Sequence, residues 1–76
     1  MNKARRNALQ EILEQVQDLR DQIERLHEEE EEYRESIPEN FHGGEKYEKT
    51  EAAVYALEEA IENLESAIEQ IEVAME

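Results

Sequence analysis

The sequence predicts an all-α fold, an antiparallel two-helix coiled-coil hairpin that takes up residues 1–76 as a single unit. Three observations predict it: both halves carry apolar residues at heptad spacing, one segment with a proline and two glycines separates them, and the chain has only 76 residues. A chain of this length is too short for a dinucleotide-binding fold or a barrel. We expect helices over residues 3–36 and 45–75 and a loop over residues 37–44.

The first helix is predicted from apolar residues that recur at alternating steps of three and four residues, the spacing of a coiled coil. Asn2 precedes the first turn and suits the N-cap position. When the heptad positions are lettered a to g, only Glu30 interrupts the apolar a and d positions. The a positions are Leu9, Val16, Ile23, Glu30 and Ile37, and the d positions are Ile12, Leu19, Leu26 and Tyr33.

The loop is predicted from one proline and one glycine pair. Pro38 has no backbone N–H and restricts Ile37 to extended geometry, so the first helix should end near Ser36. The pair Gly43–Gly44 permits positive φ and therefore a reversal of the chain. The second helix should begin directly after this pair.

The second helix repeats the pattern Leu-Glu-x-Ala-Ile with a period of seven residues, which indicates heptads rather than a solenoid repeat. A disordered acidic tail would not keep this period for four turns. The a positions are Tyr47, Val54, Ile61, Ile68 and Met75, and the d positions are Thr50, Leu57, Leu64 and Ile71.

The two helices fit each other when the chain folds back at the loop. Leu26 then lies opposite Leu57, and no a or d layer is left over. In an antiparallel pair the e positions face each other, and so do the g positions. The e positions pair Arg34 with Glu51, His27 with Glu58 and Arg20 with Glu65.

A single hairpin is one layer thick, whereas domains need two packed layers around a core. A core of this size rarely supplies more than about 3–5 kcal/mol. We therefore expect a homodimer that forms a four-helix bundle; the alternative is a marginally stable monomer. Alanines at four successive g positions of the second helix allow close approach, with a leucine on the opposite flank. The predicted dimer interface is Leu13, Ala53, Ala60, Ala67 and Ala74.

The charge balance restricts the class of partner. The chain has 22 Asp and Glu residues against 8 Lys and Arg residues, a formal net charge of −14. Such a chain repels nucleic acid and anionic lipid, so we expect no nucleic acid and no membrane among its partners. No apolar run is long enough for a membrane span or a signal peptide. Together with the absence of cysteine, this leads us to expect a cytoplasmic protein.

The sequence offers no arrangement that we expect to be catalytic, and no cofactor site. Glu24 and His27 have the Glu-x-x-His spacing of di-iron bundles. They fall at positions b and e, away from the bundle axis, so we predict a surface pair and no metal site. No nucleophile, base and oxyanion donor occur together, which indicates a protein that is not an enzyme.

The run of carboxylates from Glu28 to Glu32 is typical of a solvated helix face. It also suits contact with a basic partner. We predict an acidic surface formed by Glu28, Glu29, Glu31, Glu32, Glu62 and Glu69.

The loop places apolar and polar side chains at the end of a rod. One interpretation is a cap that seals the end of the bundle, with Phe41 folded over Tyr33 or Tyr47. The other is a partner-binding tip, since loops on rigid scaffolds often carry function. The predicted partner-binding loop is Pro38, Asn40, Phe41 and His42.

Nearly the whole chain resembles a group of small uncharacterised helical proteins of Gram-positive bacteria, their phages and prophages. The likeness rests on the basic opening (residues 2–6), the acidic run ending in Tyr33, Ile-Pro-Glu-Asn-Phe at residues 37–41, Gly-Glu-Lys-Tyr-Glu at residues 44–48 and the Leu-Glu-x-Ala-Ile repeat. The group commonly has serine where this chain has Gly44, which implies a weaker cap on the second helix. The resemblance implies a phage-associated context and a host-interaction or anti-defence role.

Two functions fit these observations. The first is a non-enzymatic helical module that self-associates and binds a protein partner, which charge predicts to be neutral or basic. The second is an acidic decoy that mimics DNA. A first helix of 34 residues is about 50 Å long, so a dimer with −28 charges carries one per about 1.8 Å, whereas duplex DNA carries one per about 1.7 Å.

Overall fold

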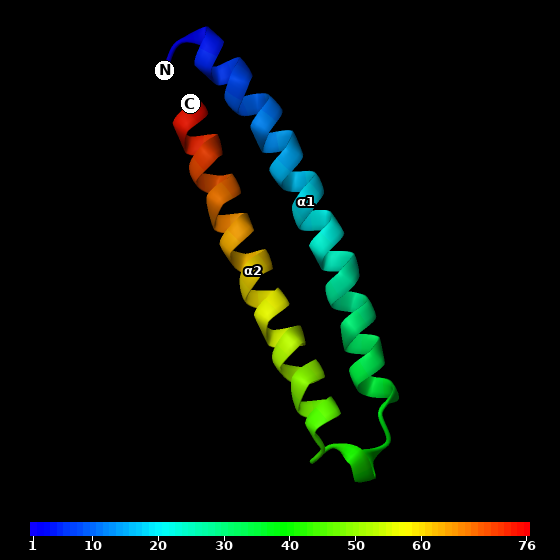
Figure 1. Cartoon of the computed structure of the whole chain (residues 1–76). Coiled ribbons are helices and arrows are strands. Elements are labelled where there is room, and N and C mark those ends of the chain that lie inside the picture. Colours follow the sequence, from blue (N-terminus) through cyan, green and yellow to red (C-terminus); the bar gives the residue numbers. More distant parts are fainter.

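The computed structural model describes all residues 1–76 as a helical hairpin. Helix α1 (Lys3–Ser36) and helix α2 (Glu45–Met75) run antiparallel, joined by the short 3₁₀ helix η1 (Glu39–Phe41). Both termini lie at one end of the rod and the loop lies at the other (Figure 1). The rod measures 59 × 15 × 13 Å. The predicted hairpin is confirmed, and the helices begin and end where the sequence predicts.

The ends of α1 follow from local chemistry. The Asn2 side chain Oδ1 accepts a hydrogen bond from the backbone N–H of Arg5 at 2.8 Å, as expected of an N-cap. At the other end, Ile37 leaves the helix in an extended conformation, with φ −74° and ψ 123°. Pro38 imposes that conformation on the residue before it.

The reversal of the chain is built differently from the prediction. Neither glycine has a positive φ, so the expected use of Gly43–Gly44 as a left-handed turn is wrong. The chain turns instead through η1, where the N–H of Phe41 donates to the oxygen of Pro38 at 2.9 Å and the N–H of His42 donates to that of Glu39 at 3.1 Å. These right-handed turns reverse the direction without any residue in the left-handed region.

The packing between the helices buries little. Only Leu13, Thr50, Val54 and Ile68 are buried, four of the 76 residues. On α1, the a and e positions face α2, while the d residues Ile12, Leu19 and Leu26 are 47%, 54% and 56% exposed. The prediction that the d positions of α1 lie in the seam is therefore wrong, because α1 is rotated about its axis toward its e positions.

The predicted register of the helices is confirmed at one e pair. The His27 ring lies 3.1 Å from the Glu58 carboxylate. The other two predicted e pairs do not form, because each arginine pairs with a carboxylate on its own helix. Arg20 contacts Asp21 at 3.1 Å and Glu24 at 4.0 Å. Arg34 contacts Glu31 on the same helix at 3.7 Å.

Candidate functional site

An uncharged face runs along one side of the hairpin. His27 and Glu58 occupy the e edge, so the d and g positions of both helices lie along the opposite edge. Those positions carry no charged residue from Ala8 to Leu26 or from Thr50 to Ala74. We call this surface the open face. It consists of Ala8, Ile12, Gln15, Leu19, Gln22 and Leu26 on α1 and Ala53, Leu57, Ala60, Leu64, Ala67, Ile71 and Ala74 on α2.

The open face is uncharged on both helices but exposed to different extents. On α1 the d residues from Ile12 to Leu26 are exposed. On α2 the d residues Leu57, Leu64 and Ile71 are half-buried. The face therefore has a raised row of large side chains on α1 beside a lower row of alanines and leucines on α2.

The residues predicted for a dimer interface fall in two places. The four alanines lie on the open face; Ala74 is exposed and the other three are half-buried. Leu13 lies inside the hairpin and is only 6% exposed. It therefore serves the packing of α1 on α2 and has almost no area left for another chain. Sequence reasoning missed the d residues of α1 because it assigned them to the seam.

The e edge holds a cluster formed by His27, Glu31 and Glu58. The Nε2 atom of His27 lies 3.1 Å from Glu58 and the Nδ1 atom lies 3.8 Å from Glu31. Each residue offers one ligand atom, an imidazole nitrogen from His27 or a carboxylate oxygen from the others, and these three atoms lie within 4.8 Å of one another. The two carboxylates meet different ring nitrogens, whereas a metal ion binds one ring nitrogen. The shorter of the two contacts, between Nε2 and Glu58, is a hydrogen bond between the helices.

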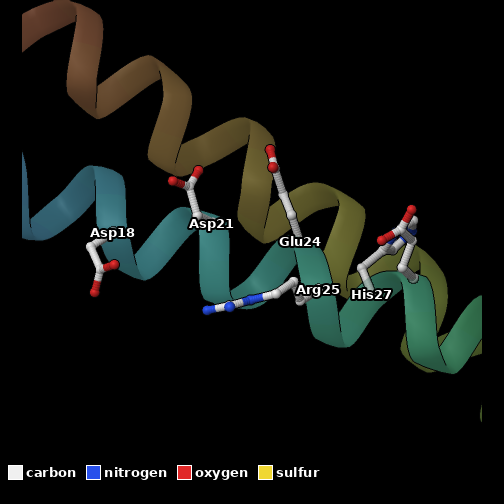
Figure 2. A pocket seen from close by; sticks show the side chains of 6 residues that line it. Asp18, Asp21, Glu24, Arg25 and His27 are labelled. Carbon is white, nitrogen blue, oxygen red and sulfur yellow. The ribbon is translucent and has the colours of Figure 1, made fainter.

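Glu24, the other half of the Glu-x-x-His spacing, does not join this cluster. It pairs with Arg20 and lines an open depression on α1, as Figure 2 shows. The depression is lined by polar or charged residues alone, whereas ligand sites combine apolar walls with a few polar groups. Its lining residues are Asp18, Asp21, Glu24, Arg25, His27 and Glu28.

The residues of the predicted acidic surface differ in burial and in ion pairing. Glu31 is half-buried and lies between His27 and Arg34, within 3.8 Å and 3.7 Å. The other predicted acidic residues are exposed, and none of them forms an ion pair within 4.0 Å. They are Glu28, Glu29, Glu32, Glu62 and Glu69.

The loop tip separates its two aromatic side chains. The His42 ring stacks on Tyr47, with centroids 4.1 Å apart and planes 16° apart, and its Nε2 lies 3.0 Å from the carbonyl oxygen of Ile37. Phe41 is 60% exposed. The interpretation that Phe41 folds over Tyr33 or Tyr47 is therefore wrong, since His42 takes that place. Of the other predicted loop residues, Pro38 and Asn40 are exposed.

Lys46 and Tyr33 join the loop end of the two helices. The Lys46 ammonium lies 5.5 Å from the centroid of the Tyr33 ring. Hydrogen bonding with the Tyr33 side chain, and then electrostatic attraction to it, raise the pKa of Lys46 above its ordinary 10.5. This contact fixes the start of α2 against the end of α1 beside the exposed Phe41.

Comparisons with known proteins give no further guide: no family model, characterised protein or solved structure matches this chain. Neither helix has a segment that is both long and apolar enough to cross a membrane.

Proposed function

We propose that this chain is a non-enzymatic helical protein-interaction module, which self-associates and binds a protein partner. The observation that carries the proposal is the open face, an exposed apolar surface without charges on a chain whose net charge is −14. Exposed apolar patches of this kind mark sites where another protein packs. A long helical face suits packing by another helix rather than capture of a small molecule.

The open face and the rest of the surface suit different contacts. Binding on the open face brings no carboxylates together, so it should depend little on salt. The exposed carboxylates and the loop tip lie outside this face. They are therefore free to contact a protein partner, neutral or basic, while the open face is covered. Phe41, exposed at the tip, is the residue best placed to anchor such a partner.

The resemblance to small helical proteins of phages and Gram-positive bacteria favours a phage-encoded factor that binds a host protein in the cytoplasm. A module that works by binding alone fits such a role, because occupying a surface of the host protein is enough. We include host interaction and anti-defence in the proposal for this reason.

The second candidate function is an acidic decoy for a DNA-binding protein. A dimer carries −28 charges, and along a rod of 59 Å this amounts to one charge per about 2.1 Å. Duplex DNA carries one per about 1.7 Å. Exposed carboxylates such as Glu62 and Glu69 on α2, and those on the outer side of α1, supply this density.

Capture of proteins from a bacterial lysate on the immobilised chain separates the two functions. The module predicts a specific protein that remains bound from 50 to 300 mM salt and is lost with Phe41→Ala or Leu19→Gln. The decoy predicts basic DNA-binding proteins that elute over the same range, and that are lost with the double variant Glu62→Gln/Glu69→Gln. Recovery of no protein by any variant or salt would contradict both.

A further inference from the structure

The hairpin exposes more surface than a compact protein of its mass. Its accessible surface is 5736 Å², whereas a compact monomer of 9.0 kDa exposes about 4,850 Å². The excess is roughly 900 Å² by that relation, close to the ~800 Å² that each partner buries in a standard protein interface. One long side of the rod, 59 by 15 Å, has the same size. The surplus is therefore of the size of one long side of the rod, and the open face takes up the part of that side away from the loop.

A second copy of this chain is the occupant that the open face fits. Two chains of net charge −14 repel each other over most of their surfaces, and the open face is where they can meet without opposing carboxylates. Its residues repeat every seven positions on both helices, about 10.5 Å along the axis. A second copy supplies a face with the same repeat, so the contacts recur in step along the open face.

The relief of the open face fixes how the copies pack. On α1 the side chains of Leu19 and Leu26 are more than half exposed, whereas on α2 the leucines are half-buried and Ala60 and Ala67 lie beside them. If α1 of each copy lies over α1 of the other, the raised rows meet along one side and the lower rows meet along the other. That arrangement separates the first pair of helices and leaves a gap at the second. Placing α1 over the partner's α2 sets a raised row against a lower row on both sides.

We propose that the open face binds a second copy of this chain about a two-fold axis parallel to the rod, with α1 of each copy packed on α2 of the other. Every neighbouring pair of helices is then antiparallel, and both loops lie at the same end of a four-helix bundle. Leu19 and Leu26 enter the spaces between the partner's alanines. The inference deepens the proposed function, on which it rests, by naming the partner of the open face and its orientation.

This dimer also places both loop tips together. Two exposed Phe41 side chains then lie at one end of the bundle, and the exposed carboxylates lie along its sides. A protein that binds this end of the bundle therefore contacts the loop tips of both chains.

Sedimentation equilibrium tests whether a second copy of the chain binds the open face. We expect the wild-type chain to have a mass of about 18 kDa, twice the 9.0 kDa of one chain, at 100 μM. Leu19→Gln and Ala67→Glu, both on the open face, should raise the dimer dissociation constant at least tenfold. Val73→Gln and Ser66→Glu are the matched controls, because they introduce the same two side chains, glutamine and glutamate, at exposed residues outside this face. They should leave the mass unchanged.

The result that overturns the proposal is a wild-type mass of 9.0 kDa at 100 μM, or a dimer that the controls weaken as much as the open-face variants. Circular dichroism shows whether each variant keeps its helices. If the open-face variants unfold, the wild-type mass and the orientation measurement below decide the matter. A monomer whose capture of a lysate protein is still lost with Leu19→Gln would remove this inference and the self-association, and would leave the binding of a protein partner standing.

Distances between spin labels test the orientation. The chain has no cysteine, so Asn40→Cys places one nitroxide on each loop. We expect a separation of about 20–30 Å, because packed helices lie ~8–10 Å apart and the label arms add the rest. A separation near the rod length of 59 Å would place the loops at opposite ends and overturn the proposed arrangement.

Discussion

The His27 ring of α1 lies 3.1 Å from the carboxylate of Glu58 on α2, a hydrogen bond between residues 31 positions apart in the chain. The contact joins the helices at their e positions and sets the register of the hairpin. We predict a coupling free energy of about 0.5 kcal/mol between the two side chains, since exposed pairs contribute ~0.2–1 kcal/mol. A double-mutant cycle of His27→Ala and Glu58→Ala by thermal unfolding measures it. Additive effects of the two variants would show that the contact does not contribute.

The start of α2 gives a second prediction. Gly44 is the N-cap residue and makes no side-chain hydrogen bond, whereas a serine there can accept one from the first turn. Its φ of −84° suits any residue, but a Cβ atom would lie 3.3 Å from the oxygen of Phe41. We expect Gly44→Ser to stabilise the hairpin by about 0.5 kcal/mol, from the cap and from a less flexible unfolded chain.

Gly43→Ala is the control for this experiment. A Cβ atom on Gly43 meets nothing within 4 Å, and the residue is not the cap. It therefore reports the effect on the unfolded chain alone. If Gly44→Ser gains no more than Gly43→Ala in chemical denaturation, the serine forms no cap.

The pKa of Lys46 gives a third prediction. Tyr33 raises this pKa above 10.5 through hydrogen bonding and electrostatic attraction. The sign follows: because the folded-state pKa lies above the unfolded value, the stabilisation is complete below pH 10.5 and is lost as the pH rises through the folded-state pKa. We therefore expect Lys46 to add no pH dependence to the stability near pH 7. NMR titration should give Lys46 a higher pKa than Lys3, and Tyr33→Phe should remove the difference.

Sequence predicted the helix bounds and the register because both depend on local chemistry. Asn2, Pro38 and the heptad spacing act on their neighbours alone, and they fix where α1 begins, where it ends and which turns face α2. The rotation of α1 was not predictable in this way. Heptad letters treat Arg20 and Arg34 as solvent residues, but both are half-buried, because long charged side chains can lay their apolar stems along a neighbouring helix.

The candidate site follows from that rotation. The absence of charge at the d and g positions was present in the sequence, and the alanine stripe was found from it. The leucines beside the stripe were missed, because which of two adjacent rows points inward depends on the side chains of the other helix. The loop was missed for a related reason: both Phe41 and His42 suit a stack on Tyr47, and their positions at the end of η1 decide between them.

Leu13 and Leu19 give a fourth prediction, because they lie on opposite sides of the rotated α1. Leu13 is buried within one chain, so Leu13→Ala should cost about 2–3 kcal/mol at every protein concentration. Leu19 is half exposed in one chain, and Leu19→Ala should cost less than about 1 kcal/mol at 1 μM and more at 100 μM, where the dimer forms. Thermal unfolding at both concentrations measures the difference. An equal cost for Leu19→Ala at both would show that the open face stays uncovered.

The loop tip gives the last prediction, which separates a structural residue from a contact residue. His42 is held by the Tyr47 ring and the Ile37 carbonyl, so His42→Ala should lower the free energy of unfolding by about 1 kcal/mol, since stacked aromatic pairs contribute ~0.5–1.5 kcal/mol. Phe41 is exposed, so Phe41→Ala should leave stability unchanged and abolish partner capture. Thermal unfolding and lysate capture on both variants test this. Loss of stability with Phe41→Ala would make Phe41 part of the fold and remove the tip as a binding surface.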